Sequence, residues 1–171
     1  MHNNLEFIGK SANGKNVFNR PYGHIHKDVT KDILKEALSS ISLTDDFHIK
    51  TINMKRIIGK YRCVPVTEQD EIVYVIRKGR YGPTPMVKNR KPIDSSFITL
   101  ILKKSDNACY ILISAFFGNE SKPEPWDNIF CNPFTLEKRE NIDEIFYQES
   151  LDFWNTHALI YDEDEIELHL S

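Results

Sequence analysis

Hydrophobic and polar positions divide the middle of the chain into three apolar stretches. These cover residues 72–76, 96–102 and 110–117, are rich in β-branched and aromatic residues, and are separated by Gly, Pro, Asp and Asn. Such runs predict three strands of one antiparallel sheet. Because residues 103–107 form only a short polar break, the last two strands are expected to pair as a hairpin.

Helical spacing appears on both sides of this region. Apolar residues recur every three or four positions between Ile33 and Ile41, which predicts an amphipathic helix with Asp28 or Thr30 as its N-cap. A short helical turn is expected at 142–147. A last helix is expected to begin at Ser150 and to bury Leu151 and Trp154 against the sheet.

These patterns together predict an α+β fold. We expect one domain over residues 23–161, with an antiparallel sheet of four to six strands flanked by an N-terminal and a C-terminal helix. Further strands are expected at 48–58 and, at a sheet edge, at 62–66. Residues 1–22 show no clear period and are expected to be a flexible arm, and residues 162–171 an exposed acidic tail.

Composition fits a globular chain of 171 residues with a net charge of −3. No apolar run approaches the roughly 18 residues of a membrane span, and the first ten residues lack a signal-peptide core. The three cysteines form no close pair, which argues against a disulfide framework and a zinc site. We therefore expect a cytoplasmic protein with no metal and no cofactor.

Charge is distributed unevenly along the chain. Residues 71–104 carry eight basic and two acidic side chains, whereas residues 119–171 carry three basic and fourteen acidic ones. The basic side chains concentrate in a Gly- and Pro-rich stretch, which suits an anionic ligand such as phosphate, although a solvated loop is the simpler alternative. The candidate phosphate-binding residues are Arg77, Arg80, Lys88, Arg90 and Lys91.

Three histidines are candidates for proton transfer or substrate contact. His24 and His26 stand two apart, so on an extended segment both would point to one face. An imidazole titrates near neutral pH, which makes His26 the candidate general acid or base and His24 its neighbour in the site. The alternative is a pair of exposed or helix-capping histidines. His157 on the last helix is either a buried hydrogen-bonded residue or part of the site.

Hydroxyl and aromatic side chains complete the candidates. Thr99 and Ser114 lie inside apolar strands, where each hydroxyl faces either a cleft or a neighbouring backbone group. Trp126 follows two prolines and could stack on a base or anchor its loop. The sequence has no GxxxxGK[ST], GxGxxG, HExxH or GxSxG motif, so nucleotide phosphate loops, zinc proteolysis and hydrolase elbows lose their usual signals.

With these residues placed, the chain resembles the barnase–EndoU–colicin–RelE-like nuclease superfamily, in particular its phage and mobile-element branches. The resemblance covers roughly residues 24–161. It rests on the order of a helix before a small sheet and on short motifs: RKGR at 77–80, RKP at 90–92, SFITL at 96–100, LISA at 112–115 and FWNTHAL at 153–159.

The resemblance implies metal-independent cleavage of RNA, often by toxins, in which the 2′-hydroxyl attacks the adjacent phosphate. His26 would move the proton, Arg77 and Arg80 would hold the phosphate, and Ser114 would supply a hydroxyl. An inhibitory or immunity protein is then an expected partner. The alternative from another class is a non-catalytic protein- or nucleic-acid-binding module, and a third is a ligand-binding domain that uses the same basic cleft. The net acidic charge departs from a typical free RNA-binding toxin.

Overall fold

The computed structural model describes residues 5–119 and 121–170. Contacts divide the chain into two compact units, one formed by Met1–Tyr61 with Ile93–Glu120 and the other by Arg62–Pro92 with Ser121–Ser171. We call them unit 1 and unit 2 and describe each by itself. The fold is mixed α+β, as predicted, and the described residues contain two α-helices among many strands. The domain limits expected from the sequence stay a prediction.

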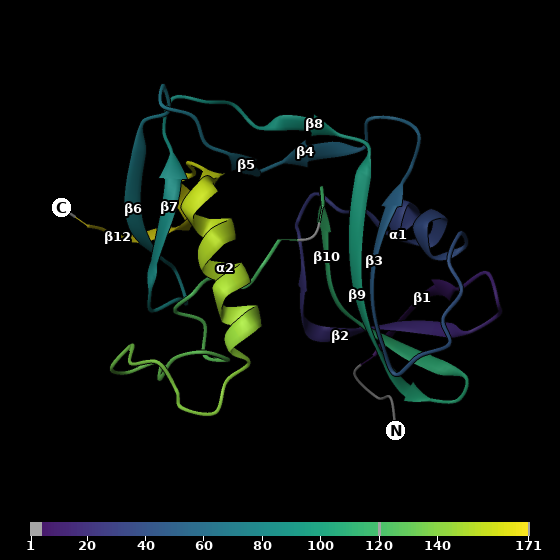
Figure 1. The fold of residues 1–171 in the computed structure, drawn as a ribbon. Helices are drawn as coiled ribbons and strands as arrows, with labels where there is room; N and C mark the ends of the chain where they lie inside the picture. The colour runs from purple at the N-terminus through teal and green to yellow at the C-terminus, as the bar shows by residue number, and fades with distance from the viewer. Residues whose placement is uncertain (1–4, 120, 171) are drawn as a thin grey trace. The chain divides into compact units, whose positions relative to one another are not determined.

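Unit 1 is a five-stranded sheet with one helix and a two-stranded ribbon (Figure 1). The sheet order is β1-β2-β10-β9-β3, and only the β2–β10 pair is parallel. The elements are β1 (Glu6–Lys10), β2 (Asn16–Ile25), α1 (Lys31–Leu38), β3 (Phe47–Asn53), β9 (Phe97–Asp106) and β10 (Cys109–Phe117), with β4 (Gly59–Tyr61) and β8 (Ile93–Ser95) forming the ribbon. The predicted β9–β10 hairpin is confirmed.

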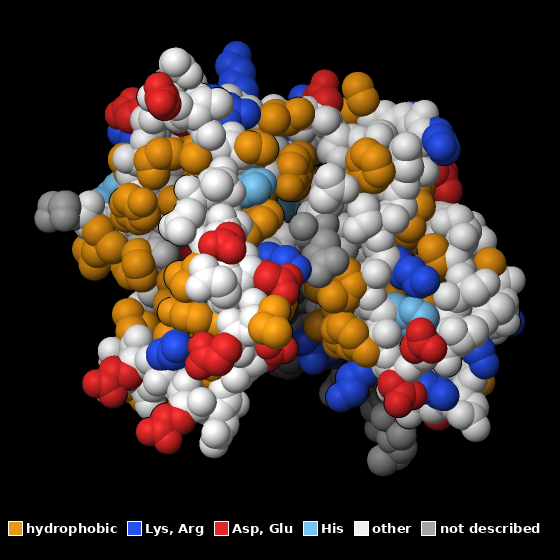
Figure 2. All heavy atoms as spheres, viewed as in Figure 1, with side chains coloured by type: hydrophobic (Ala, Val, Ile, Leu, Met, Phe, Trp, Pro, Cys, Tyr) orange, Lys and Arg blue, Asp and Glu red, His pale blue; other side chains and the backbone are white. Residues whose placement is uncertain are grey.

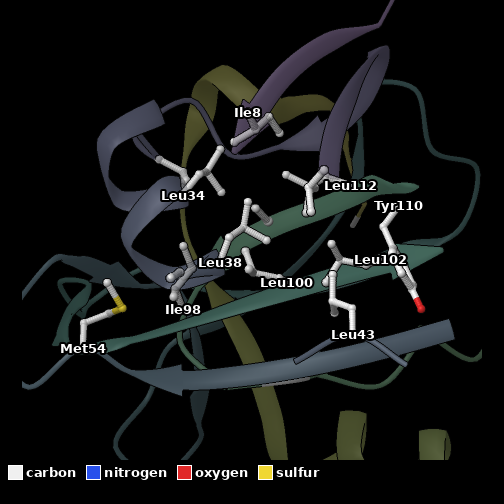
Figure 3. Packing of buried hydrophobic residues seen from close by; sticks show 14 of the residues in the cluster. Ile8, Leu34, Leu38, Leu43, Met54, Ile98, Leu100, Leu102, Tyr110 and Leu112 are labelled. Carbon is white, nitrogen blue, oxygen red and sulfur yellow. The ribbon is translucent and has the colours of Figure 1, made fainter. Parts of the chain in front are cut away.

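The core of unit 1 lies between α1 and one face of this sheet. Strand alternation directs Ile98, Leu100 and Leu102 of β9 to this face, where Leu34 and Leu38 of α1 pack (Figure 3). The Thr30 hydroxyl accepts a hydrogen bond from the Ile33 N–H, so Thr30 is the N-cap, as the sequence suggested. The first helix is therefore confirmed.

Unit 2 holds a second five-stranded sheet in the order β12-β6-β7-β11-β5, with only β7 and β11 parallel. Its elements are β5 (Cys63–Pro65), β6 (Ile72–Arg77), β7 (Pro83–Val87), α2 (Glu144–Thr156), β11 (His157–Ile160), a 3-10 turn (Glu163–Glu165) and β12 (Ile166–His169). β5 is an edge strand, as expected. A small core in unit 2 is formed by Val64, Val87, Ala158 and Ile160.

Several expectations need correction. The three central runs do not form one sheet, because β6 belongs to unit 2 whereas β9 and β10 belong to unit 1. The basic stretch 77–92 is not only a loop: β7 pairs with β6 along its whole length. β7 tolerates Pro83 and Pro85 because its other neighbour, β11, pairs with it only at Met86 and Val87. The first residues of β7 therefore need fewer backbone N–H donors.

The described parts of both terminal regions contain strands that were not expected. The described part of the expected arm, residues 5–22, contains β1 and most of β2, which continue the sheet through backbone pairing with β10. The expected acidic tail contains β12, which pairs with β6. The last helix begins at Glu144 rather than at Ser150, because Asp143 caps it, and Leu151 and Trp154 are half-buried instead of enclosed.

Candidate functional site

The eleven predicted site residues fall into the two units. Unit 1 contains His24, His26, Thr99 and Ser114, and unit 2 contains Arg77, Arg80, Lys88, Arg90, Lys91, Trp126 and His157. The two groups are therefore described separately, starting with unit 1.

His26 follows β2 directly and has a half-buried ring. Its Nδ1 accepts the N–H of Asp28 at 3.2 Å, and its ring centroid lies 6.2 Å from that of Phe117. Phe117 belongs to the buried core face of the sheet. His26 thus acts as a local turn residue whose Nε2 is the nitrogen left for other partners.

Ser114 and Thr99 sit on neighbouring strands. The backbone of Ser114 pairs in register with His24, whose side chain lies outside the described part of the chain. Since Ala115 points to the core, strand alternation places Ser114 on the opposite face of the sheet. Thr99 is fully buried, and its hydroxyl donates to the Gly118 carbonyl at 2.7 Å, which satisfies it internally.

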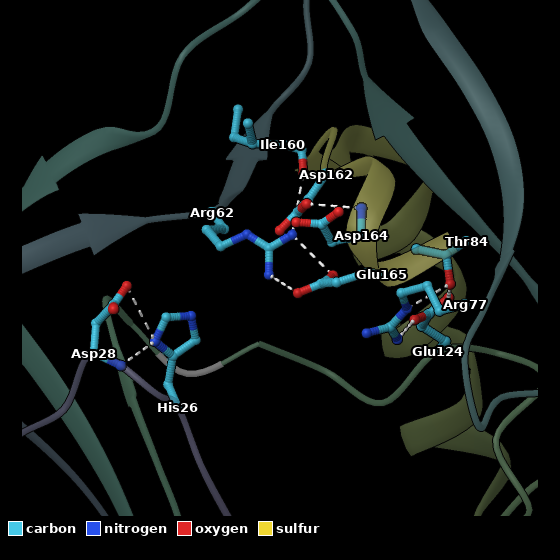
Figure 4. A network of polar contacts seen from close by, with 10 residues as sticks. All are labelled: His26, Asp28, Arg62, Arg77, Thr84, Glu124, Ile160, Asp162, Asp164 and Glu165. Atoms are coloured by element: carbon cyan, nitrogen blue, oxygen red, sulfur yellow. Dashed lines mark hydrogen bonds and ion pairs between the residues drawn. The ribbon is translucent and has the colours of Figure 1, made fainter. Parts of the chain in front are cut away.

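Arg77 in unit 2 is held by internal partners (Figure 4). Its Nη2 donates to Oε1 of Glu124 at 2.6 Å, and its Nε donates to the Thr84 hydroxyl at 3.2 Å. Oε2 of Glu124 accepts hydrogen bonds from the Thr84 hydroxyl at 2.7 Å and from the Trp126 indole at 2.8 Å. These hydrogen bonds connect the loop of Glu124 and Trp126 to β6 and β7 within unit 2.

The Glu124 carboxylate in this network is only 6% exposed. Burial raises its pKa above the ordinary value, and the Arg77 charge opposes that shift. A guanidinium committed to a desolvated carboxylate is costly to release, because the carboxylate would stay behind unpaired. The structure therefore gives Arg77 a structural role.

Arg80 lies near Arg77 on a cavity of about 310 Å³ that Lys78, Asp164 and Glu165 also line. The structure thus brings the two predicted clamp arginines together. It also places two acidic residues at the same cavity, and Glu165 pairs with Arg62 at 2.5 Å (Figure 4). Carboxylates at this position oppose phosphate binding.

The other predicted residues of unit 2 have local partners. Arg90 donates to the Pro65 carbonyl at 2.8 Å and pairs with Asp70 at 3.2 Å. The Lys88 ammonium lies 5.4 Å from the centroid of the Tyr161 ring. The His157 ring stacks on Phe153, with centroids 4.0 Å apart. These contacts account for each side chain without a ligand. Trp126 is buried, as the anchor of its loop.

A feature that the sequence did not reveal lies on the face of the unit 1 sheet opposite α1. Register places one residue from each strand in a transverse row, Phe7, Phe18, Ile111, Lys103 and Phe47. Beside this row lie Ile49, Ile101, Ile113 and Arg20. We call these nine residues the open face. Phe7 is 50% exposed and Phe47 is 52% exposed, so aromatic surface is accessible near both edges of the sheet.

The open face also carries free positive charge. Arg20 and Lys103 form no ion pair with any described residue. The neighbouring Lys104, which is not part of the open face, reaches Asp46 only at 3.9 Å. These three cations, together with Leu5, Ile111 and Ile113, line a cavity of about 480 Å³. Unit 1 as a whole has twelve basic and nine acidic side chains.

A sequence signal for this face exists only in part. Phe47, Ile49 and Thr51 alternate correctly for one face of a strand, but His48 and Ile52 serve the core face, so both faces look apolar. The partners of these residues lie on strands far away in the sequence. The row can therefore be recognised only once the register is known.

Neither a metal site nor a membrane span is evident within residues 5–119 and 121–170. No three His, Cys, Asp or Glu side chains there are grouped closely enough to hold a metal ion. Over the same ranges, no helix has the combined length and apolar character needed to cross a bilayer.

Comparisons with known proteins bear on the fold. A scan against protein-family models and a search of curated proteins found no match. Among solved structures, the chain is similar to a conserved hypothetical protein from Toxoplasma gondii ME49, with a TM-score of 0.52 and 15% sequence identity. The similarity covers 81% of this chain and 89% of that chain, which indicates a shared fold.

Proposed function

We propose that this protein is a non-catalytic nucleic-acid-binding module that holds single-stranded RNA on the open face of unit 1. The observation that carries the proposal is the row of Phe7, Phe18 and Phe47 on one sheet face, with Lys103 inside the row and Arg20 beside it. A cytoplasmic location, as expected from the cysteines, belongs to the same proposal.

Aromatic rings on an open sheet suit unpaired bases. A base stacked on an aromatic side chain contributes about 1–3 kcal/mol to the binding free energy whichever base it is, because every base has a π-face. Phe18 on β2 and Phe47 on β3 stand three strand spacings apart, or roughly 14 Å, which leaves room for more than one base between the two rings. Paired bases in a duplex cannot reach these rings, so single strands are favoured.

The cations of the open face suit the phosphate backbone. An Arg or Lys without an internal partner can contact phosphate without giving up an existing ion pair. Among the described residues, Arg20 and Lys103 form no ion pair, whereas Arg77 and Arg90 are engaged with Glu124 and Asp70. Lys78 and Arg80 of unit 2 also form no ion pair with a described residue, but Asp164 and Glu165 line the same cavity and oppose an anion there. This difference favours unit 1 over the basic stretch of unit 2 as the anion-binding surface.

The geometry within unit 1 supports binding more than cleavage. The ring of His26 packs against Phe117 of the core face, whereas Ser114 points to the other face. General acid–base catalysis requires its groups within hydrogen-bond reach of one substrate. RNA cleavage with His26, Arg77, Arg80 and Ser114 stays a prediction, and its test is given below.

The stacking contribution can be tested by fluorescence anisotropy with a labelled single-stranded RNA. Phe47→Ala should weaken affinity on the order of 5- to 150-fold, the equivalent of losing one stacked base. Phe134→Ala is the matched control, because Phe134 is 94% exposed but lies in unit 2. Equal affinity of wild type and Phe47→Ala would contradict the proposal, as would tighter binding of a duplex than of the single strand.

The charge contribution has its own readout. Lys103→Ala should lower the slope of log affinity against log salt by about 0.7, the value for one phosphate contact on a single strand. Lys27→Ala is the control, since Lys27 is an exposed cation of unit 1 in the turn before α1. An unchanged slope for Lys103→Ala would remove Lys103 from the interface.

A further inference from the structure

Unit 2 contains a pocket of about 310 Å³ with aromatic walls. Tyr74 comes from β6, Trp126 from the loop after Ser121, and Tyr147 and Trp154 from α2. The other lining residues are Pro83, Pro85, Glu124, Pro125, Cys131, Leu136 and Asn155. We call it the aromatic pocket. The pocket belongs to unit 2, whereas the open face belongs to unit 1. The proposed RNA binding does not involve the pocket.

The two tryptophan rings of the pocket are fixed by hydrogen bonds. The indole N–H of Trp126 donates to the Pro83 carbonyl at 2.7 Å and to Glu124, and that of Trp154 donates to the Lys122 carbonyl at 2.9 Å. Because both donors are used, the rings offer a ligand their π surfaces and not their N–H groups. Their orientation is set before a ligand arrives, which lowers the entropy cost of binding.

The unit that contains the pocket carries a negative excess. Unit 2 has ten basic and sixteen acidic side chains, and hydrophobic and acidic groups lie side by side over α2 and the preceding loop (Figure 2). The described carboxylates of residues 121–156 that form no ion pair are Asp127, Glu137, Glu140, Asp143 and Asp152. Ammonium groups already use nearby rings: Lys138 lies 5.1 Å from the Tyr147 centroid and Lys122 lies 5.6 Å from that of Phe146.

The hydrogen-bonding state of Glu124 restricts the kind of cation. Both of its oxygens accept from Arg77, Thr84 and Trp126, so the carboxylate has little capacity for another donor. A primary ammonium or a guanidinium entering the pocket would lose hydrogen bonds to water, and the other side-chain acceptors of the wall are those of Asn155 and two tyrosine hydroxyls. A quaternary ammonium has no N–H to satisfy, and its methyl groups gain from burial against rings.

We infer that the aromatic pocket of unit 2 binds an alkylated ammonium group. Two sources share this chemistry: a free choline-type molecule and a trimethylated lysine side chain of a partner protein. In either case the ring faces attract the charge and the apolar walls bury the methyl groups. The inference is independent of RNA binding by unit 1, so either can fail without the other.

The chain provides a direct reporter for this test. Its two tryptophans, Trp126 and Trp154, both line the pocket, so intrinsic fluorescence responds to a ligand there. Tetramethylammonium chloride and choline should give saturable changes at constant ionic strength set with NaCl. The neutral choline isostere 3,3-dimethylbutanol should bind on the order of 3- to 30-fold more weakly, because it lacks the charge. A trimethyllysine peptide compared with its unmodified form distinguishes the partner-protein source from the free molecule.

Variants locate the effect in the pocket. Tyr74 is 54% exposed, so Tyr74→Ala is expected to fold and should weaken tetramethylammonium binding on the order of 3- to 30-fold. Tyr74→Phe keeps the ring and should retain affinity, while Phe134→Ala, in the same unit but outside the pocket, should bind as wild type.

Several results would overturn the inference. A saturable response to the neutral isostere equal to that of choline would make the pocket a simple apolar site. Linear, non-saturating changes with every ligand would mean that the pocket has no affinity for ammonium. Unchanged binding by a folded Tyr74→Ala variant would place any affinity elsewhere.

Discussion

Gly82 shows how one missing side chain organises unit 2. A Cβ at Gly82 would lie 2.0 Å from Cγ of Trp126 and 2.6 Å from its Cβ. The backbone before β7 therefore passes directly over the indole, which also contacts the Tyr81 ring edge-on with centroids 5.0 Å apart. Only glycine allows the backbone to pass this close to the indole. The contact fixes the position of Trp126, which forms one wall of the aromatic pocket and donates a hydrogen bond to Glu124.

Gly82→Ala should therefore destabilise the protein by about 1–3 kcal/mol, the usual cost of overpacking a filled site. The measurement is the urea dependence of unfolding followed by circular dichroism. Gly9→Ala is the matched control in a strand, because its nearest neighbour would be Cγ of Lys35 at 3.4 Å, an ordinary contact. Equal midpoints for the two variants would show that Trp126 can move aside.

At this scale, the sequence identified residue types better than partners. The arginines at 77 and 80 were expected to share a site, and both line one cavity. The partner of Arg77, however, is Glu124, which is 47 positions away, and the sequence offers no pattern that joins them. For Thr99 the sequence leaves a cleft or a neighbouring backbone group as the partner of the hydroxyl, and the structure shows the backbone group, the Gly118 carbonyl.

Helix starts depend on single capping residues. The start of α1 was predictable because Thr30 precedes a clear apolar period, whereas α2 carries Phe146, Tyr147 and Phe153 on more than one side and lacks such a period. Asp143 accepts the N–H groups of Ile145 and Phe146 at 3.1 and 3.0 Å. This cap extends the helix back from Ser150 and brings Tyr147 to the aromatic pocket.

Asp143→Ala should cost about 1 kcal/mol of unfolding free energy, because two N–H groups lose their acceptor and the helix N-terminus loses a favourable negative charge. Thermal or urea unfolding measures this change. Asp143→Asn keeps a capping oxygen and should retain most of the stability. If Asp143→Asn and Asp143→Ala lower the unfolding free energy equally, the charge of Asp143 stabilises the helix and its hydrogen bonds do not.

Strands were harder to assign to sheets than to recognise. The run at 72–76 was correctly predicted as a strand, but its partner β7 contains two prolines and was hidden in an apparently turn-rich stretch. β1 was missed because it has only five residues and a register shift near Gly9. Pairing between segments distant in sequence decides both cases, and local pattern does not encode it.

For the whole molecule, the uneven charge of the sequence is distributed over two units. The basic stretch lies in unit 2, yet that unit is acidic overall, since the C-terminal acidic residues join it. Unit 1 has the positive excess, and Arg20 and Lys103 on its open face form no ion pair with any described residue. This distribution explains why a net charge of −3 is compatible with an anion-binding face on one unit and a cation-binding pocket on the other.

Binding and cleavage of RNA make opposite predictions for the intact protein. Purified protein incubated with total RNA in EDTA should retain the RNA and form no product, if the open face only binds. The ribonuclease hypothesis requires cleavage that survives EDTA and leaves 2′,3′-cyclic phosphate ends. In that case His26→Ala should slow cleavage roughly 10²–10⁴-fold, because a general acid or base is lost, while affinity hardly changes.

The two hypotheses also differ in which variants matter. Binding by the open face predicts that Phe47→Ala loses RNA while His26→Ala and Arg80→Ala retain it. Catalysis predicts that Arg80→Ala reduces both binding and rate, because a phosphate clamp contacts ground state and transition state alike. Product formation by wild type but not by His26→Ala, repeated after any co-purifying inhibitor is removed, would refute the non-catalytic assignment and leave the open face as a substrate-binding surface.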